Sequence, residues 1–447
     1  MLKEYISAYT GKQVGFVGVG ISNIPIIQMF CRYGASVTVR DMKSPDKIYG
    51  IEKLEGLDIT YITGSDYLCD IKEDLLFLAP AVRDDKPELV EAMKNGTLVT
   101  TELNEFLKIC PCKTFAVTGS DGKTTTTTLI AKLLEAGNKK VWLGGNIGKN
   151  LFQSLDEISP EDYAVMECSS FQLMKMSFSP DVAVITNLSP NHLDWHTGME
   201  EYFESKKNIY RFNKNTKIIT NIDNAYTASI ADEREIYPIS CEKKLENGVY
   251  FDGSAVYYNG NKVLNDEDII LPGVHNRYNY CCAIAATIDI IGADTVKSVA
   301  TTFGGVEHRC ELVRTVNGIR FYNSSIDSSP TRTAAACNAF KQKVIVICGG
   351  YDKNIPLEPL GPLFTEKVKS CVLMGATAEK INTVLENCGY SGQILRADSM
   401  EDAVNKAYSI SGDGDCVLLS PAAASFDMFR NFEERGNIFK NCVNTLN

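Results

Sequence analysis

Short apolar runs alternate with stretches of helical periodicity over the first hundred residues. The apolar runs predict strands at residues 13–18, 36–40 and 74–78, and apolar positions three to four residues apart predict a helix at 24–33. Strands that alternate with helices are typical of a parallel sheet covered by helices. The N-terminal part of the chain is therefore predicted to be an α/β unit.

The same alternation is repeated twice further along the chain. The second series predicts helices at 125–135, 200–211 and 276–291, and strands at 114–118, 141–143, 164–167, 182–186 and 217–220. Residues 248–264, where tyrosines flank Asp-Gly and Asn-Gly turns, predict a hairpin meander. The third series predicts strands at 320–322, 344–348, 371–374 and 416–419. Three α/β domains, at residues 1–102, 103–305 and 306–447, account for this pattern.

Composition narrows the class of protein. A chain of 447 residues is too long for one core, and its 44% apolar and 23% charged residues are typical of a globular protein. The longest apolar run, at residues 281–293, is interrupted by Asp289 and falls short of the roughly 18 residues that a membrane span needs. The first residues lack the apolar segment of a signal peptide, so we expect a cytoplasmic protein with no membrane partner.

Charge and cysteine usage argue against nucleic acid and against structural zinc. Lys and Arg number 45 against 56 Asp and Glu, and the net charge of −11 would repel a nucleic-acid backbone. The 15 cysteines include no Cys-x-x-Cys pair, and several lie in apolar runs: Cys281, Cys282, Cys348, Cys371 and Cys416. We expect reduced, buried thiols that serve as small apolar side chains.

A glycine turn follows the first predicted strand. Gly18 and Gly20 lie where a strand ends and a helix begins, and Asp41 ends the next strand. Such glycines let a phosphate approach a helix N-terminus, and a carboxylate at the position of Asp41 meets the sugar of a nucleotide. Position 23, where a dinucleotide fingerprint has its third glycine, is Asn. Two interpretations stay open: a nucleotide site, such as that of an NAD-dependent oxidoreductase, and a tight turn without a ligand.

The second α/β series opens with a candidate phosphate loop. Its sequence is Gly-Ser-Asp-Gly-Lys-Thr-Thr at residues 119–125, between a predicted strand and a helix. In such loops backbone amides contact phosphate oxygens, the lysine reaches the outer phosphates and the threonine hydroxyl binds Mg²⁺. Val117 replaces the first glycine of the full P-loop spacing, and the five threonines at 124–128 are poor helix formers. A conflict with local propensity is expected at a functional site, and we predict nucleotide binding.

Acidic and histidine side chains follow two strands of the same series. Glu167 ends one predicted strand, and the sequence Asn-His-Leu-Asp-Trp-His at 191–196 follows another. The carboxyl ends of parallel strands meet at the edge where ligands bind, and Mg²⁺ prefers oxygen ligands. Glu167 and His192 are therefore candidate Mg²⁺ ligands, whereas a zinc site lacks a third protein ligand. Asp194 and His196 fit a role at the metal and a hydrogen-bonded turn equally well.

Together these motifs resemble the Mur ligase family, the ATP-dependent amide-forming enzymes of peptidoglycan precursor synthesis. The motifs are Thr-Gly-Ser-Asp-Gly-Lys-Thr-Thr (118–125), Gly-Gly-Asn-Ile-Gly (144–148), Glu-Cys-Ser-Ser-Phe-Gln-Leu (167–173), Asn-His-Leu-Asp-Trp-His (191–196), His-Asn-Arg-Tyr-Asn (275–279) and Glu-His-Arg (307–309). Residues 169–173 and 420–436 resemble most closely the members that add D-glutamate to UDP-N-acetylmuramoyl-L-alanine. The resemblance implies a monomeric enzyme with a Rossmann-like domain for the UDP-sugar nucleotide, a central P-loop-type ATPase domain with a mostly parallel sheet, and a Rossmann-like C-terminal domain for the amino acid.

The resemblance also implies roles for individual residues. The UDP-substrate would contact Gly18, Gly20, Ile21, Ser22, Asp41, Met42, Lys43 and Asn146. ATP would contact Gly119, Ser120, Asp121, Gly122, Lys123, Thr124, Thr125, Asn276, Arg309 and Ser324. Two Mg²⁺ ions would be held by Thr124, Glu167, His192 and Lys206, the last as a carbamylated, anionic lysine. D-glutamate would contact Lys353, Ser425 and Phe432, and the catalytic residues would be Lys123, His192 and Lys206.

Two positions depart from the family pattern. Ser324 stands where family members usually carry the aspartate of an Asn-Asp-Ser sequence, and Ala79-Pro80-Ala81 stands for Ser-Pro-Gly. The aspartate would act near ATP, and the missing glycine would reshape the loop around the uridine nucleotide. The alternatives are a related ligase, such as a folylpolyglutamate-type enzyme that adds another amino acid, and a non-catalytic relative.

Overall fold

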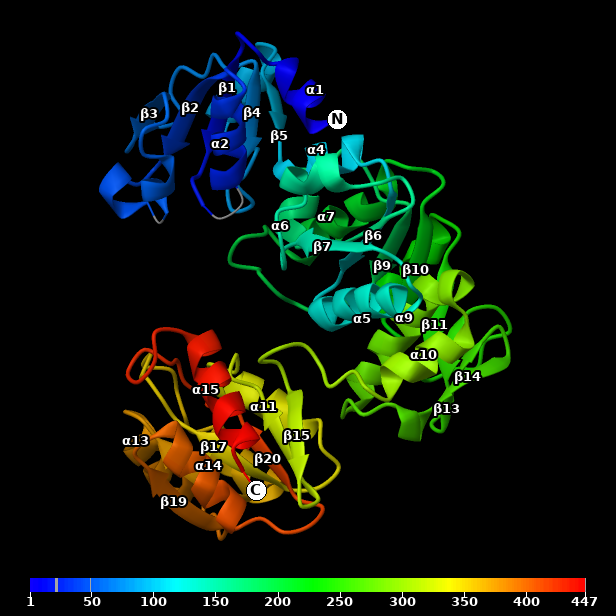
Figure 1. Ribbon diagram of the computed structural model, residues 1–447, viewed down its shortest axis with the longest axis vertical. Coiled ribbons are helices and arrows are strands. Elements are labelled where there is room, and N and C mark those ends of the chain that lie inside the picture. The colour runs from blue at the N-terminus through cyan, green and yellow to red at the C-terminus, as the bar shows by residue number, and fades with distance from the viewer. Residues whose placement is uncertain (21–22, 49, 447) are drawn as a thin grey trace. The chain divides into compact units, whose positions relative to one another are not determined.

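Three mostly parallel sheets organise the chain (Figure 1). The structure is a computed structural model that describes residues 1–20, 23–48 and 50–446. The chain forms two compact units, Met1–Asp266 with Tyr278–Val299, and Glu267–Arg277 with Ala300–Asn447. Over the described residues, the first unit contains a five-stranded and a nine-stranded sheet, and the second unit contains a six-stranded sheet.

The first sheet has a Rossmann-like strand order. Its strands are all parallel and follow the order β3-β2-β1-β4-β5, so the order reverses on either side of β1. The central strands β1 and β4 are buried on both faces, which explains their continuous apolar sequence. The elements of this region are α1 (Leu2–Ser7), β1 (Gln13–Val17), α2 (Ile24–Arg32), β2 (Ser36–Asp41), η1 (Pro45–Lys47), η2 (Ile51–Leu54), β3 (Ile59–Thr63), β4 (Leu75–Leu78), α3 (Pro87–Lys94), β5 (Leu98–Thr100) and α4 (Glu102–Ile109).

The second sheet follows the order β14-β13-β12-β11-β10-β9-β6-β8-β7. From β12 to β7 in this order, each strand is parallel to its neighbours. Strands β12, β13 and β14 form the antiparallel meander that the sequence predicts. Its elements are β6 (Lys113–Thr118), α5 (Lys123–Ala136), β7 (Val141–Gly145), η3 (Phe152–Glu157), β8 (Tyr163–Glu167), α6 (Ser170–Leu173), β9 (Val182–Ile185), α7 (Met199–Arg211), β10 (Lys217–Asn221), α8 (Ala225–Ala228), η4 (Ser229–Asp232), β11 (Tyr237–Ser240), β12 (Val249–Phe251), β13 (Ala255–Tyr258), β14 (Asn261–Asn265), η5 (Asp266–Asp268), α9 (Val274–Ile291) and α10 (Ala293–Ala300).

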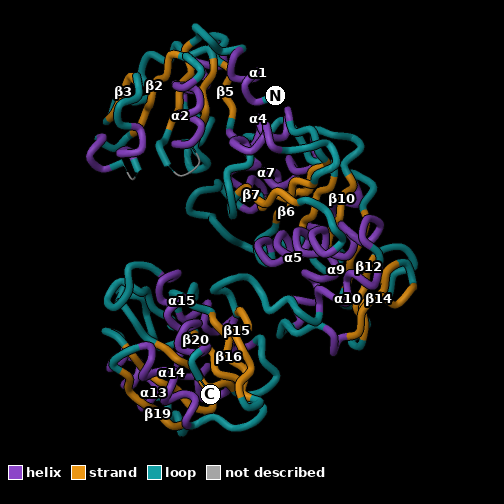
Figure 2. Tube along the Cα trace, viewed as in Figure 1, coloured by secondary structure: helices purple, strands orange, loops and turns teal. Residues whose placement is uncertain are grey.

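The third sheet follows the order β15-β16-β20-β17-β18-β19. The edge strand β15 is antiparallel to β16, and the other neighbours pair in parallel. Its elements are β15 (Glu311–Val316), β16 (Ile319–Asn323), α11 (Pro330–Asn338), β17 (Val344–Cys348), α12 (Leu360–Lys367), β18 (Val368–Met374), α13 (Ala378–Asn387), β19 (Gln393–Ala397), α14 (Met400–Ser409), β20 (Cys416–Leu419) and α15 (Phe432–Asn444). Figure 2 shows strands and helices interleaved in all three sheets, so the predicted mostly parallel α/β class is confirmed.

Aromatic side chains join the two sheets of the first unit. The rings of Phe16 and Phe77 stack with centroids 5.1 Å apart, and Phe77 meets Phe152 of η3 edge-on at 6.5 Å. The ring of Tyr5 in α1 also meets Phe152 edge-on, with centroids 5.5 Å apart. All three phenylalanines are fully buried, so the first sheet and the start of the second share a core.

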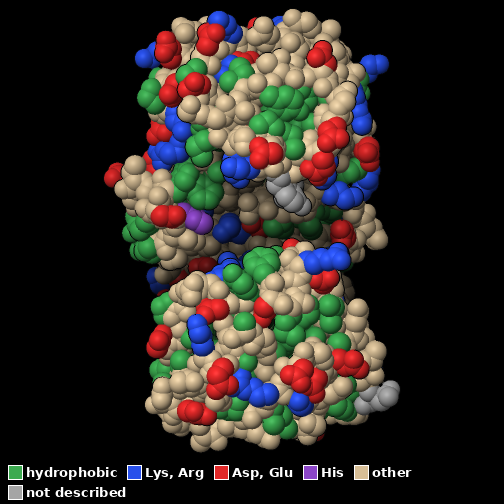
Figure 3. Space-filling model, turned by 90° about the vertical axis from the view of Figure 1, so that its left-hand side faces the viewer, with side chains coloured by type: hydrophobic (Ala, Val, Ile, Leu, Met, Phe, Trp, Pro, Cys, Tyr) green, Lys and Arg blue, Asp and Glu red, His purple; other side chains and the backbone are tan. Residues whose placement is uncertain are grey.

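Three expectations about the chain concern its cysteines, its charge and its helices. All 15 cysteines are free thiols, and the five that the sequence places in apolar runs are buried, as predicted. On the face drawn in Figure 3, the described Lys and Arg side chains are interspersed with Asp and Glu and form no continuous basic area. Among the described residues, no helix is both long enough and apolar enough to cross a membrane.

Candidate active site

The candidate phosphate loop connects β6 to α5 within the nine-stranded sheet. Gly119 and Gly122 have φ angles of 145° and 79°, a conformation that favours glycine. A Cβ atom at Gly119 would lie 1.9 Å from the Thr186 Oγ1 atom, and one at Gly122 would lie 2.3 Å from the Asn279 Oδ1 atom. The amide of Thr126 donates to the Gly122 carbonyl at 2.9 Å, so α5 begins directly after the loop. The first amides of a helix point out of its N-terminus, as in sites that bind anions.

The threonine run that follows the loop is helical. Helix α5 begins at Lys123, two residues before the predicted start. The hydroxyls of Thr127 and Thr128 donate to the carbonyls of Lys123 and Thr124, four residues back, at 2.8 Å each. These bonds satisfy the hydroxyls inside the helix, and the burial of Thr126 and Thr127 adds packing. Tertiary packing therefore outweighs the low helix propensity of threonine, which is why the predicted start was wrong.

Two lysines converge on the carbonyl oxygens of the phosphate loop. Lys123 Nζ donates to the carbonyls of Gly119 and Ser120, both at 2.9 Å. Lys206 of α7 donates to the Gly119 carbonyl at 3.0 Å and to the Thr118 hydroxyl at 3.1 Å. Lys206 is 1% exposed, and its burial, with the charge of Lys123 nearby, lowers the pKa of its amine well below the usual value. Burial therefore favours a neutral, nucleophilic amine at Lys206.

Glu167 ends β8. Its Oε1 atom accepts a hydrogen bond from the Asn146 side-chain amide at 2.7 Å, and the Asn146 backbone amide donates to the Glu167 carbonyl at 2.8 Å. Its Oε2 atom is buried and has no hydrogen-bond partner among the described residues. A buried carboxylate oxygen costs free energy unless a cation or a hydrogen-bond donor meets it. Glu167 therefore has the chemistry of a Mg²⁺ ligand.

His192 follows β9 with the left-handed φ angle of 55°. Its ring lies 4.9 Å from the ring of Phe171, and its side chain is largely exposed. Partial burial and the positive charges of Lys123 and Lys206 lower the pKa of His192. A neutral imidazole is the form that binds a metal ion.

Four of the predicted residues influence one another's protonation. Lys206 responds to Lys123 and Glu167, and His192 responds to Lys123 and Lys206. Thr124 lies in the first turn of α5, next to Lys123. Within the described part of the chain, no three His, Cys, Asp or Glu side chains gather as a metal cage.

The N-terminal glycine turn is held by a carboxylate. Asp41 accepts hydrogen bonds from the backbone amides of Val19 at 2.8 Å and Lys43 at 2.9 Å. Gly18 has a φ angle of 80°, and a Cβ atom there would lie 2.8 Å from the Cβ of Ala79. Asn23, at the place of the third fingerprint glycine, donates to the Gly18 carbonyl at 2.8 Å.

The other residues predicted for the UDP-substrate lie near this turn or at the second sheet. Met42 and Lys43 are exposed after β2, and Gly20 has open space around it. Asn146 is bonded to Glu167, as described above. Ile21 and Ser22 lie outside the described residues. The structure thus shows Asp41 as the brace of the glycine turn, and contact of these residues with a nucleotide sugar stays a prediction.

Three residues predicted to contact ATP belong to the second unit. Asn276 is buried, and its side-chain amide donates to the Pro272 carbonyl at 2.6 Å. Arg309 is exposed, whereas Ser324 is 1% exposed and its hydroxyl accepts from the Cys310 amide at 3.1 Å. At the position where the resemblance predicts an aspartate, this chain has a small hydroxyl that accepts a hydrogen bond from a neighbouring turn.

Two of the residues predicted for the amino acid, Lys353 and Ser425, lie on hydrogen-bonded loops of the second unit, and the third, Phe432, begins α15. The Tyr351 amide donates to the Ala424 carbonyl at 2.9 Å, which joins the loop of Lys353 to that of Ser425. The buried guanidinium of Arg435 donates to the Ala424 carbonyl at 3.0 Å. Lys353 is exposed, Ser425 is buried and the ring of Phe432 meets His308 edge-on at 5.9 Å. The backbone hydrogen bond brings the loops of Lys353 and Ser425 together, and their contact with an amino acid stays a prediction.

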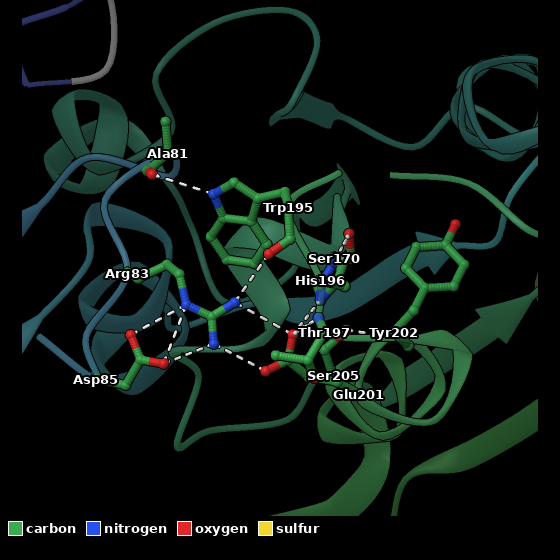
Figure 4. Close-up of polar contacts among 10 residues, drawn as sticks. All are labelled: Ala81, Arg83, Asp85, Ser170, Trp195, His196, Thr197, Glu201, Tyr202 and Ser205. Atoms are coloured by element: carbon green, nitrogen blue, oxygen red, sulfur yellow. Dashed lines mark hydrogen bonds and ion pairs between the residues drawn. The ribbon is translucent and has the colours of Figure 1, made fainter. Parts of the chain in front are cut away.

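Sequence reasoning missed Arg83 and Glu201, which join His196 and Ser170 in a hydrogen-bonded chain beside this site (Figure 4). His196 contacts Ser170 through one ring nitrogen and Glu201 through the other, and Glu201 is paired with Arg83. His196 lies in a motif that the sequence singles out, and the structure shows it as a buried, hydrogen-bonded residue. Arg83 lies more than 110 positions before its partner and carries no signal in the sequence.

Two family models and several full-length relatives match this chain. The family model described as the Mur ligase middle domain matches residues 117–287, and the Mur ligase, glutamate ligase domain matches residues 308–423. A UDP-N-acetylmuramoylalanine–D-glutamate ligase from Acetivibrio thermocellus is 48% identical over 100% of this chain and 99% of its own length. A protein of the same name from Ruminiclostridium cellulolyticum is 46% identical over 100% of this chain and 99% of its own.

A solved structure agrees at the level of the fold. MurF ligase from Thermotoga maritima in complex with ADP is 17% identical, with a TM-score of 0.56 over 98% of this chain and 96% of that one. On the strength of the full-length relatives, the chain belongs to the Mur ligase family.

Proposed function

We propose that the protein joins D-glutamate to UDP-N-acetylmuramoyl-L-alanine in an ATP-dependent reaction of peptidoglycan precursor synthesis. The observation that carries the proposal is the group of Lys123, Lys206 and Glu167 around the phosphate loop, with one Glu167 oxygen buried and unpaired. This arrangement offers cations to a polyphosphate and an anion to a metal at the same sheet edge. The full-length relatives named UDP-N-acetylmuramoylalanine–D-glutamate ligase support this proposal.

The chemistry follows from the need to activate a carboxylate in water. A carboxylate oxygen of the nucleotide substrate attacks the γ-phosphorus of ATP, the bond to the β,γ-bridging oxygen breaks, and ADP leaves. The amine of D-glutamate then attacks the acyl carbon, the bond from that carbon to the phosphate oxygen breaks, and phosphate leaves with loss of a proton from nitrogen. Lys123 would neutralise the phosphate charge that repels the incoming carboxylate. The backbone amides that begin α5 would hold the phosphates in place.

Glu167, His192 and Thr124 are proposed to hold Mg²⁺, with Lys206 as a fourth ligand once carbamylated. Bound Mg²⁺ would supply charge neutralisation at the transferred phosphoryl group. The unpaired Glu167 Oε2 atom fits such a cation. Lys206 is buried and bonds to two uncharged oxygens, an environment that favours reaction of its neutral amine with CO₂ to give an anionic carbamate.

The remaining contacts are proposed from the resemblance. Gly18, Gly20 and Asp41, with Asn146 and the neighbouring residues named above, would hold the UDP-sugar, and Lys353, Ser425 and Phe432 would hold D-glutamate. Asn276 and Arg309, with Ser324 at the position of the family aspartate, would contact ATP. We propose a monomeric, cytoplasmic enzyme that acts on these small molecules.

Phosphate release tests the proposal. The protein is incubated with ATP and Mg²⁺, and UDP-N-acetylmuramoyl-L-alanine or D-glutamate is omitted in turn, with L-glutamate as a substitute. We expect release only with both substrates, preference for the D-isomer, and a product heavier by one glutamate residue. Release with a folate substrate instead would favour the folylpolyglutamate-type alternative. ATP binding without release would indicate a non-catalytic relative, and Ser324→Asp would then test whether the missing aspartate is the cause.

A further inference from the structure

His196 is a buried ring with both nitrogens engaged. Its Nε2 atom lies 3.0 Å from the Ser170 hydroxyl, and its Nδ1 atom lies 3.1 Å from the Glu201 Oε2 atom. The hydrogen bond from Arg83 holds the pKa of Glu201 at about 2, so this carboxylate is an ionised acceptor. His196 Nδ1 must therefore donate to Glu201, and in the neutral ring Nε2 accepts from Ser170. Burial lowers the pKa of His196 and favours this neutral tautomer.

Arg83 extends the chain of hydrogen bonds to the first sheet. It follows β4, and its two terminal nitrogens donate to the Glu201 carboxylate at 2.8 Å and 3.2 Å. It also donates to the Trp195 carbonyl at 3.0 Å and lies 4.8 Å from the centre of that ring. The Trp195 indole in turn donates to the Ala81 carbonyl at 3.4 Å. A forked guanidinium that bonds a carboxylate twice fixes orientation as well as distance.

Two members of this hydrogen-bonded chain, Ser170 and Glu201, lie close in sequence to residues of the candidate active site. Ser170 begins α6, three positions after Glu167, and Glu201 lies on α7, five positions before Lys206. The amides of Trp195 and His196 both donate to the carbonyl of His192, so the ring of His196 is one turn away from that residue. Figure 4 shows Arg83 reaching from the loop with Ala81 to the turn that contains Trp195 and His196. Arg83 is therefore connected to three segments that carry proposed metal ligands. It bonds directly to the turn after His192 and to helix α7 of Lys206, and through His196 and Ser170 it is connected to the strand end of Glu167.

We propose that Arg83 and His196 are positioning residues, which couple the loop after β4 to the phosphoryl-transfer site through Glu201 and Ser170. The inference rests on the proposed ligase function, for which the first sheet binds the nucleotide substrate. Arg83 moves with that loop. The hydrogen bonds of Glu201, His196 and Ser170 then fix the positions of the strand end that carries Glu167 and of the helix that carries Lys206. Neither residue contacts the reacting atoms.

Steady-state kinetics of Arg83→Ala and Arg83→Lys test the coupling. We expect Arg83→Ala to lower kcat at least tenfold and to leave the KM for ATP within twofold, because the phosphate loop itself is unchanged. Arg83→Lys keeps the charge and loses the fork, so it should recover only part of the rate. Arg234→Ala is the matched control, because Arg234 also donates to backbone carbonyls and lies over the ring of Tyr210 on α7. Its kcat should stay near that of the wild type, and equal losses in Arg83→Ala and Arg234→Ala would overturn the inference.

Two His196 variants test separately the hydrogen bond to Glu201 and the hydrogen bond to Ser170. The side-chain amide of His196→Asn lies where Nδ1 lay and keeps the bond to Glu201, whereas that of His196→Gln reaches toward Ser170. We expect both to lower kcat, and we expect the loss in Arg83→Ala/His196→Asn to be smaller than the product of the single losses, since the residues act in series. A loss of kcat in the double variant equal to that product would mean that Arg83 and His196 act independently, which would contradict the proposal.

Amide hydrogen exchange gives a test that does not depend on turnover. In Arg83→Ala, the amides of residues 168–173 should exchange faster than in the wild type, and in Arg234→Ala they should not. Unchanged exchange in Arg83→Ala overturns the inference, even if the wild-type protein shows no ligase activity. Absence of substrate-dependent phosphate release from the wild type overturns the proposed function instead, so the two failures are distinguishable.

Discussion

The first sheet and helix α7 beside the second sheet each bury a basic side chain almost completely, but the two side chains have different hydrogen-bond partners. Arg40 in β2 is 2% exposed and faces the equally buried Glu73, with bonds of 2.6 Å and 3.1 Å to its two carboxylate oxygens. The carbonyls of Tyr67, Cys69 and Asp70 accept its other hydrogens. Lys206 in α7 is 1% exposed, and its amine donates to a hydroxyl and a carbonyl, neither of which is charged.

The difference separates a structural charge from a chemical one. A buried cation with a carboxylate and a full set of acceptors is held in one protonation state and one geometry. A buried amine with neutral acceptors is free to lose its proton, and a neutral amine can react. Burial alone is therefore a poor guide to function, and the charge of the hydrogen-bond partners is a better one.

The largest expected effect comes from breaking the Arg40–Glu73 pair. Glu73→Ala should lower the free energy of unfolding by about 3–5 kcal/mol, because it leaves the Arg40 charge buried without a partner. Urea denaturation measures this change. Replacing both residues, as Arg40→Met with Glu73→Leu, should cost much less because no charge is left behind. A double variant as unstable as the single one would show that packing, rather than charge, is responsible.

The opposite pattern is expected at Lys206. Lys206→Met should leave the free energy of unfolding unchanged or higher, and should lower the rate of substrate-dependent phosphate release about 10²–10³-fold, the usual scale for losing one charge-stabilising group. Lys207→Met is the matched control, because the neighbouring lysine is buried and paired with Glu204 and Glu233. Lys207→Met should lose stability and keep most of its rate, and a similar loss of rate in both variants would remove the distinction.

Asp327 extends the comparison to a buried anion. It is 6% exposed and accepts from the Ser420 hydroxyl at 2.8 Å, and burial raises the pKa of its carboxyl to about 6. Because the folded pKa lies above the usual value, its contribution to stability is greatest below pH about 4, declines as the pH rises to about 6, and is lost above that. Asp327→Asn should therefore be more stable than the wild type at pH 8, by about 3 kcal/mol at most, and the advantage should vanish near pH 4. Thermal unfolding between pH 4 and 8 measures it, and a difference independent of pH would refute the assignment.

The smallest effect is expected at an exposed pair. Lys132 and Glu135 of α5 lie 2.8 Å apart, and their side chains are 53% and 46% exposed. Glu135→Gln should change the free energy of unfolding by less than about 1 kcal/mol, because water screens both charges. This variant is the reference for the buried pair, and a larger effect would mean that burial is not what distinguishes Arg40.

The sequence predicts the central strands better than the edges of the sheets. The buried strands β1, β4, β17 and β20 agree with their predictions to within one residue. The strands that were missed are β3, β5, β11, β15 and β19, and all except β11 lie at a sheet edge. In β3 every side chain is at least partly exposed, so it lacks the apolar run that burial on both faces imposes.

The residues of the candidate site also differ in how well the sequence predicts them. The phosphate loop follows β6, Glu167 ends β8 and His192 lies seven residues after the end of β9. Their places near the carboxyl ends of parallel strands are enough to predict that they meet at one sheet edge. Arg83 reaches Glu201 only because the two sheets pack together, and no local pattern records that contact. Ser170, His196 and Glu201 all belong to the region of the second sheet. Lys206 falls between these cases, since an arbitrary lysine on a helix is usually solvated and only the resemblance singled it out.

The division of the chain into units has a consequence for its synthesis on the ribosome. The first unit ends at Asp266 and resumes at Tyr278, and the resumed segment includes Cys281, Cys282 and Ile284, all fully buried. Helix α9 supplies the Ala285 carbonyl to Lys217 of β10 and the Ile291 side chain beside Gly137. A nascent chain that has emerged only to Asp266 would expose that apolar surface, so the first unit can finish folding only after residue 299 leaves the exit tunnel. Truncation at the apparent end of the nine-stranded sheet should therefore yield an aggregating fragment, and extension to residue 299 should yield a soluble one.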